Sequence, residues 1–222
     1  MNRPGTRPWI NWGLIGLNLI IFVAELVLTG NFSAEPTYYL FINFGVVPYF
    51  ILQAFRGVGI LSLATLVTSQ FLHAGFWHVA GNMLFLFVFG DNVEDRFGHV
   101  KYLAFYLAAG VIGGLAQVYI SAATGPPDIY IPGVGASGAI SGALAAYLVF
   151  YPKAQVISLL GYFIAPVRAY WFIGGWFLLQ LLLSSGGVDT GVAYAAHIGG
   201  FVSGLAIAGA VRLLRGRLEP EN

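Results

Sequence analysis

The chain has no cysteine and very few charges. Asp, Glu, Lys and Arg make up 9% of its 222 residues, against about 25% in a typical soluble domain. The absence of cysteine excludes disulfides, thiolate nucleophiles and zinc–thiolate sites. The formal net charge of +1 argues against a nucleic-acid partner. So few charged side chains cannot cover a globular domain in water.

Hydrophobic residues dominate instead, at 58% of the chain. They gather in runs that can cross a bilayer, which takes about 20 apolar residues in a helix rising about 1.5 Å per residue. Six predicted transmembrane helices cover residues 10–29, 78–93, 100–121, 136–151, 167–185 and 190–211. No A-x-A cleavage signature follows the first run, so we interpret it as an anchor and not as a signal peptide. The sequence predicts an all-α polytopic membrane protein with one domain over residues 1–222.

The basic residues set the predicted orientation. With six spans and a cytoplasmic N-terminus, the cytoplasmic segments hold Arg3, Arg7, Arg96, Lys101, Lys153, Arg168, Arg212, Arg215 and Arg217. Only Arg56 falls outside, which is a strong positive-inside bias. Residues 30–76 are apolar but interrupted by Pro48, Arg56 and several glycines, and another span there would destroy the bias. We therefore expect both termini in the cytoplasm, a long, partly embedded external loop over 30–76, and a location in the cell (inner or plasma) membrane.

A stretch of small residues, GVGASGAISG over 133–142, opens the short fourth helix. Such residues either let another helix pack closely or leave a serine free to react. A helix over 137–151 is about 21 Å long, against a hydrocarbon core of about 30 Å. Ser137 is therefore expected several ångströms below the outer surface. His197, in the sixth helix, lies about 10 Å from that surface.

Further polar residues are predicted at the same depth. His78 and Asn82 are spaced i, i+4 and so share one face of the second helix, and His73 stands just before that helix. Each residue alone is explained by packing or by hydrogen bonds between helices. Polar side chains inside a membrane are costly and tend to mark function. Their convergence on separate helices therefore favours chemistry, in a site that opens to the external face.

These groups are of the types that acyl transfer requires. Ser137 is the candidate nucleophile, and His197 is the candidate base that activates it. The backbone N–H of Ser137, the His78 imidazole and the Asn82 amide are candidate donors to the oxyanion. The sequence thus predicts a serine hydrolase site.

Competing assignments are weaker. Ser141, one turn after Ser137, competes as nucleophile. Ser137 is favoured because it stands at the helix start among glycines. A dyad is favoured over a triad, because Asp189 stands in a loop eight residues from the candidate base. His73 and His78 are five residues apart without an H-E-x-x-H pattern or a nearby carboxylate, which disfavours a metalloprotease. We expect no metal and no cofactor.

The ordered motifs of the chain resemble those of the rhomboid intramembrane serine proteases. They are HAGFWHVAGN (73–82), EDRFG (94–98), GASG (135–138) and AHIGGFVSG (196–204). The resemblance runs from about residue 44 to residue 206, in a chain with six predicted spans. It implies a bundle of six transmembrane helices. It also implies a bacterial-type protease that cuts membrane-anchored proteins in or near a transmembrane segment that unwinds readily.

The resemblance also implies roles, position by position. Ser137 matches the nucleophile and His197 its base. His78 and Asn82 match the oxyanion partners, and His73 matches a histidine that helps to hold the adjacent loop and to retain water. Supporting positions are the glycines beside the nucleophile and the small face that packs the sixth helix on the fourth: Gly135, Gly138, Gly200 and Gly204.

Two positions add detail to the resemblance. Glu94 matches a structural hydrogen-bonding residue on the inner side. Ser141 stands where some members place an aromatic ring that stacks on the catalytic histidine, so the sequence leaves open how the His197 ring is held. The Trp-Arg pair that some members carry in the external loop is not evident in residues 30–76.

Two other classes of function are open to such a chain. A non-catalytic rhomboid-like scaffold or chaperone would bind transmembrane helices, but proteins of that kind usually lose the serine or the histidine, and this chain keeps both. A small transporter is expected to show inverted repeats or charges near the bilayer midplane, whereas here the charges lie near helix ends. The sequence favours an endopeptidase whose partners are transmembrane protein substrates and the lipid bilayer.

Overall fold

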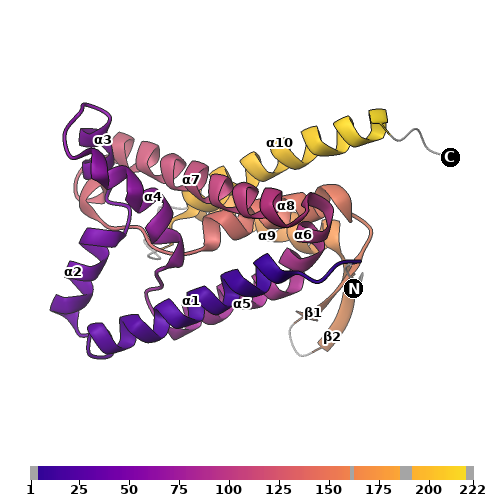
Figure 1. Ribbon diagram of the computed structural model, residues 1–222, viewed down its shortest axis with the longest axis horizontal. Helices are drawn as coiled ribbons and strands as arrows, with labels where there is room; N and C mark the ends of the chain where they lie inside the picture. The colour runs from indigo at the N-terminus through magenta and orange to yellow at the C-terminus, as the bar shows by residue number, and fades with distance from the viewer. Residues whose placement is uncertain (1–4, 161–162, 186–191, 219–222) are drawn as a thin grey trace.

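The computed structural model describes residues 5–160, 163–185 and 192–218 (Figure 1). The longer helices are α1 (Trp9–Leu28), α2 (Ala34–Phe44), α3 (Pro48–Ala54), α5 (Phe76–Phe85), α6 (Asp91–Phe97), α7 (His99–Thr124), α8 (Ser137–Phe150), α9 (Ala169–Ser185) and α10 (Tyr194–Leu218). The shorter turns are η1 (Ile60–Ala64), α4 (Thr65–Thr68), η2 (Ser69–Phe71), η3 (Leu86–Gly90) and η4 (Asp128–Tyr130). Two strands, β1 (Gln155–Leu160) and β2 (Phe163–Arg168), pair as an antiparallel hairpin. The protein is mostly helical.

Several helices have the length and composition of membrane spans. These are α1, α7 and α10, and the helical stretches Ile60–Phe71 and Phe76–Phe97 add up to one more as a pair bent by 81°. The helices α8 and α9 are apolar but shorter. The outward side chains of the membrane spans are apolar too. Val27 of α1, for example, is 76% exposed, as expected where lipid is the solvent. The chain is a multi-pass membrane protein.

Each of the six predicted apolar runs contains a helix, but the helices begin or end at residues other than those predicted. The predicted 78–93 helix continues through α5, η3 and α6, and the predicted 100–121 helix extends to Thr124 in α7. The last helix begins at Tyr194. Its predicted start at 190, and Asp189, fall within residues 186–191, outside the described residues.

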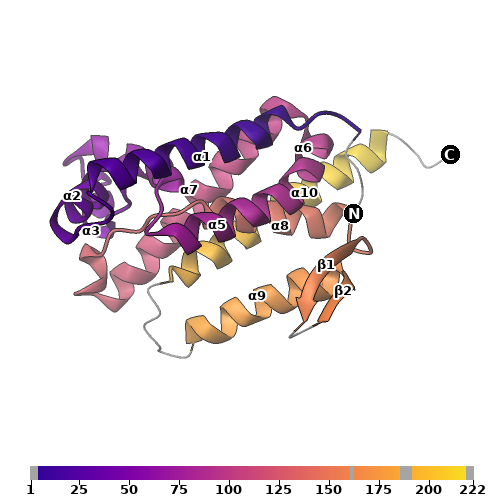
Figure 2. The same ribbon diagram turned by 90° about the horizontal axis from the view of Figure 1, so that it is seen from below.

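The helix α8 lies at the centre of the bundle. Every residue from 138 to 147 is buried, and the helix packs against α7, α10, η3 and α9. A helix that is apolar on all sides is stable only when it is surrounded in this way. Figure 2 shows α9 on the opposite side of the bundle from α1.

Glycine brings α8 and α10 into backbone contact. A Cβ atom built on Gly200 would overlap the carbonyl oxygen of Gly138, and one built on Gly204 would overlap that of Gly142. Small residues spaced by four let helices approach closely in a bilayer, where apolar surface alone does not drive them together. The two backbones therefore touch close to the first turn of α8.

The segment that leads into α8 is held by the region between α1 and α5. Val46 and Gly133 exchange two backbone hydrogen bonds of 2.9 and 2.8 Å. The Gly135 N–H donates to the Ser69 carbonyl at 2.9 Å. Residues 30–76, predicted as a loop, thus contain short helices that fix the approach to Ser137.

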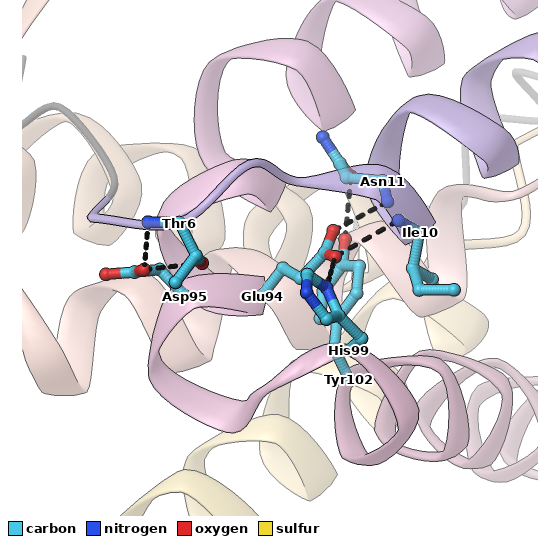
Figure 3. Close-up of polar contacts among 7 residues, drawn as sticks. All are labelled: Thr6, Ile10, Asn11, Glu94, Asp95, His99 and Tyr102. Atoms are coloured by element: carbon cyan, nitrogen blue, oxygen red, sulfur yellow. Dashed lines mark hydrogen bonds and ion pairs between the residues drawn. The ribbon is translucent and has the colours of Figure 1, made fainter.

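The start of α1 is held by carboxylates of α6 (Figure 3). Glu94 accepts the backbone N–H groups of Ile10 at 3.0 Å and Asn11 at 2.7 Å, and it also contacts the His99 ring. Asp95 accepts the N–H of Thr6 at 2.9 Å and its hydroxyl at 2.7 Å. The first N–H groups of a helix lack partners within it and favour negative charge, so these contacts stabilise the helix start.

A π-helical turn lies beside the same contacts. The Asn11 amide donates to the carbonyl of Leu86, the first residue of η3, at 3.0 Å, and it accepts the Tyr102 hydroxyl at 2.8 Å. A π turn departs from the regular pattern of helix hydrogen bonds, so a side-chain donor to one of its carbonyls is stabilising. The buried Asn11 therefore ties α1 to η3 and α7.

The all-α prediction is wrong over residues 155–160 and 163–168, which form the strands β1 and β2 of the hairpin. Val156 and Ser158 are buried while Ile157 between them is exposed, and this period of two is that of a strand. β-branched and aromatic residues favour extended backbone, and Pro166 is incompatible with a helix interior. Figures 1 and 2 show the hairpin at the same end of the molecule as the start of α1 and the end of α10, away from α2 and α3.

Candidate active site

Ser137 and His197 are in direct contact. Ser137 is the first residue of α8, His197 lies in the first turn of α10, and the Ser137 Oγ is 2.7 Å from the His197 Nε2. The two residues are 60 positions apart in the sequence, and the glycine contact between α8 and α10 brings them together. This is the distance at which a hydroxyl passes its proton to an imidazole.

The other ring nitrogen of His197 also has a partner. Its Nδ1 is 2.9 Å from the Oε1 of Gln180, a residue of α9 that is only 7% exposed. The Trp176 ring, one turn earlier on α9, lies 6.0 Å from the imidazole at an interplanar angle of 33°. Sequence reasoning missed Gln180, although a lone amide in a Trp- and Leu-rich segment of membrane length is itself a signal of function.

Ser141 is placed differently from Ser137. It is fully buried, and its hydroxyl donates to the Ser137 backbone carbonyl at 2.6 Å. Both serines border the same cavity, but Ser137 is only half-buried. The Ser141 hydroxyl is therefore engaged within its own helix, while the Ser137 hydroxyl faces the imidazole.

His78 faces the backbone just before α8. Its Nδ1 accepts the Ala74 N–H at 3.4 Å, so the neutral ring carries its proton on Nε2. A Cβ atom on Gly135 would lie 2.7 Å from that Nε2. Gly135 also has φ +129°, in the region that favours glycine. The absence of a side chain at this position therefore makes room for the His78 donor beside Ser137.

Asn82 lies one turn after His78 on α5 and lines the same cavity. It is 8% exposed, and its Nδ2 has no hydrogen-bond partner among the described residues. A buried donor without a partner costs about 1–3 kcal/mol, so such a group calls for an explanation. It is available to a ligand in the cavity.

His73 stands behind these groups. It is fully buried, and its ring lies 5.1 Å from that of His78 in an edge-to-face arrangement. Its backbone N–H donates to the buried Glu25 carboxylate of α1 at 3.0 Å. The turn before α5 is thus fixed to α1 at this point. No group of three or more His, Cys, Asp or Glu side chains in the described part of the chain is placed to hold a metal ion.

A cavity of about 770 Å³ joins the site residues, with Trp77, His78, Asn82, Ser137, Gln180 and His197 in its lining. It presents a serine bonded to an imidazole, with an imidazole donor and an amide donor on the facing helix α5. The first N–H groups of α8 have no acceptor within that helix, so they add further donors. Such an arrangement can activate a hydroxyl and stabilise negative charge on an oxygen that forms next to it.

Comparison with known proteins identifies relatives of the chain. Residues 61–213 match the family model described as the rhomboid domain. Rhomboid protease AarA of Providencia stuartii is 33% identical over 162 residues, which are 69% of this chain and 58% of that protein. Rhomboid protein 1, mitochondrial, of Saccharomyces cerevisiae is 28% identical over 151 residues, 66% of this chain and 41% of that protein. The presenilin-associated rhomboid-like protein, mitochondrial, of Homo sapiens is 31% identical over 144 residues, 63% and 36% of the two chains. The chain spans less than two thirds of the length of each of these relatives.

Proposed function

The chain belongs to the rhomboid family, and we propose that it is an intramembrane serine endopeptidase. Its substrates are membrane-anchored proteins, cut in or near a transmembrane segment. Ser137 is the nucleophile and His197 the general base. The observation that carries the proposal is the 2.7 Å contact between the Ser137 Oγ and the His197 Nε2 at the wall of a cavity.

The reaction proceeds in two halves. The Ser137 oxygen attacks the carbonyl carbon of the scissile bond while its proton passes to the His197 Nε2. The imidazolium then gives that proton to the leaving amine, the C–N bond breaks, and an acyl ester of the serine remains. In the second half, His197 takes a proton from water and the resulting hydroxide attacks the ester. The imidazolium then returns the proton to the serine oxygen as the ester C–O bond breaks and the carboxyl fragment leaves.

The oxyanion of each half-reaction needs donors already in place. The backbone N–H of Ser137, the His78 Nε2–H and the Asn82 amide fill this role. The unpaired Asn82 Nδ2 and the tautomer that the Ala74 N–H imposes on His78 support the assignment. His73, fixed by the Glu25 contact, supports the turn and retains water in the cavity.

The membrane arrangement is part of the proposal. The helices α8 and α9 join the longer ones as spans in a six-helix rhomboid-like bundle, a single membrane domain over residues 1–222. One buried core that includes residues from α1 to α10, Leu14 to Ala208, supports a single domain. Both termini and the β1–β2 hairpin lie in the cytoplasm of a cell (inner or plasma) membrane, and the cavity opens to the external face. Residues 30–76 are external and partly embedded.

Cleavage in liposomes tests the proposal. The full chain is reconstituted with a panel of single-pass reporters that carry small, helix-destabilising residues near the outer end of the transmembrane segment. We expect the wild type to cut members of the panel, and we expect Ser137→Ala and His197→Ala to cut none while they retain the wild-type melting temperature. Cleavage by Ser137→Ala would refute the assignment. Reporter binding without cleavage by the wild type would instead favour a scaffold.

A further inference from the structure

We propose that Gln180 is the positioning residue of the base. Its amide oxygen accepts the Nδ1–H of His197, which leaves Nε2 unprotonated and directed at the Ser137 hydroxyl. The inference rests on the proposed function, since it assigns a role within the same site. It replaces a simple pair of residues by a chain of three that runs from α9 through α10 to α8.

The geometry defines the direction of each hydrogen bond. Neutral imidazole has one donor nitrogen and one acceptor nitrogen. The Gln180 Oε1, 2.9 Å from Nδ1, can only accept, so the proton of the ring lies on Nδ1. The Nε2, 2.7 Å from the Ser137 Oγ, is then the acceptor that a general base requires.

The burial of Gln180 makes this contact selective. The residue is 7% exposed, so water competes little for its amide oxygen, and a hydrogen bond in such surroundings is stronger than in water. Trp176 and Gln180 are spaced i, i+4 and share one face of α9. One helix face therefore holds the imidazole both by a ring contact and by a hydrogen bond.

The same face of α9 explains how the ring is held. Ser141 of α8 occupies the position at which an aromatic ring stacks on the histidine in some members of the family that the sequence resembles. Its hydroxyl is turned to the Ser137 carbonyl and gives the imidazole no support. Trp176, packed against Phe85 and Phe201, supplies the ring contact from the opposite helix.

A neutral amide is a weaker partner than a carboxylate. The carboxylate of a serine-protease triad fixes the tautomer of the histidine and also stabilises the imidazolium by its charge, whereas the oxygen of a neutral amide can fix the tautomer but carries no net charge to stabilise the imidazolium. A net neutral hydrogen bond contributes about 0.5–1.5 kcal/mol. Loss of the Gln180 acceptor should therefore reduce the rate by roughly threefold to tenfold.

The test compares two Gln180 variants with a neighbour on α9. Gln180→Met keeps the length of the side chain and removes the acceptor, whereas Gln180→Glu keeps an acceptor and removes the amide donor. Leu179→Ala, at a half-exposed position of the same helix, is the control. The rate of serine labelling by a fluorophosphonate probe is measured on the full chain in detergent over a range of pH. The neutral tautomer of His197 is read from its ¹⁵N chemical shifts, with His197→Ala to assign the signals.

We expect Gln180→Met to label roughly threefold to tenfold more slowly, with the acid limb of its rate profile at lower pH, because the imidazolium has lost an acceptor. Gln180→Glu should restore the rate and move the acid limb to higher pH. In the described part of the chain, the other titratable side chains that line the cavity of His197 are His78 of α5, Asp128 of η4 and Tyr194 of α10, and all three are unchanged. The ¹⁵N shifts should report Nδ1–H in the wild type and a mixture of tautomers in Gln180→Met.

Two results would overturn the inference. One is a wild-type rate and profile in Gln180→Met. The other is a loss in both Gln180 variants with no movement of the acid limb, which indicates a packing role. Failure of the proposed function gives a different result, because the wild type itself would then not react with the probe, while the ¹⁵N shifts would still report the tautomer.

Discussion

Substitution of Gly200 by alanine should separate Ser137 from His197. A Cβ atom at this position would lie 2.8 Å from the carbonyl carbon of Gly138, and closer still to its oxygen. Reaching the 3.4 Å at which ordinary contact begins requires a shift of at least 0.6 Å between α8 and α10. The overlapping atoms of Gly138 belong to the backbone of α8, so no change of side-chain rotamer can relieve the contact.

The magnitude follows from the position of the contact. A shift of 0.6 Å would lengthen the 2.7 Å distance between the Ser137 Oγ and the His197 Nε2 by up to that amount. The distance would then exceed the range of a good hydrogen bond, about 2.5–3.2 Å. A misplacement of about 1 Å costs a catalytic site about 10²-fold, and overpacking costs about 1–3 kcal/mol of stability. We therefore expect Gly200→Ala to label with fluorophosphonate about 10- to 100-fold more slowly and to melt at a lower temperature.

The matched control lies on the same helix. A Cβ atom on Gly209 of α10 would meet nothing within 4 Å. Gly209→Ala should label at the wild-type rate and be as stable as the wild type, or more stable by up to about 1 kcal/mol, because alanine favours helix. A Gly200→Ala variant with the rate and melting temperature of the wild type would refute the packing argument.

Three other substitutions test separate parts of the site and the fold. Asn82→Ala should reduce the cleavage rate by about 10²-fold, as loss of one oxyanion donor does, and an unchanged rate would remove Asn82 from that role. Ser141→Ala should label within about threefold of the wild type, because its hydroxyl bonds to a backbone carbonyl of its own helix; abolished labelling would reopen the choice of nucleophile. Glu94→Gln should lower the free energy of unfolding by about 1–3 kcal/mol, because it weakens the hold on the Ile10 and Asn11 N–H groups. Its labelling rate per folded molecule should stay constant, and a wild-type melting curve would contradict the structural role.

The helices could be predicted from the sequence because their signal is local. An apolar run of membrane length needs no knowledge of its neighbours, and each predicted run contains a helix. The hairpin β1–β2 was missed for a related reason. Its short apolar segments resemble parts of helices in composition, and only the alternation around Ile157 and the presence of Pro166 distinguish them.

The site was predictable only where small motifs carry its residues. Ser137 stands among glycines and His197 in a Gly-rich helix face, so both attract attention in the sequence. Gln180 has no such setting, and its contact with His197 depends on how α9 is oriented against α10. That orientation arises from packing over the whole helix, including the Trp176 and Phe201 contact, and no local pattern encodes it.

Fluorophosphonate labelling with peptide mapping tests the central claim most directly, because it requires no knowledge of the substrate. The purified full chain in mild detergent is treated beside Ser137→Ala, Ser141→Ala and His197→Ala, each shown to be folded by its melting curve. The account predicts one modified residue, Ser137, with labelling lost in Ser137→Ala and His197→Ala and kept in Ser141→Ala. A folded wild type that takes up no probe, or a label on a residue other than Ser137, would contradict it.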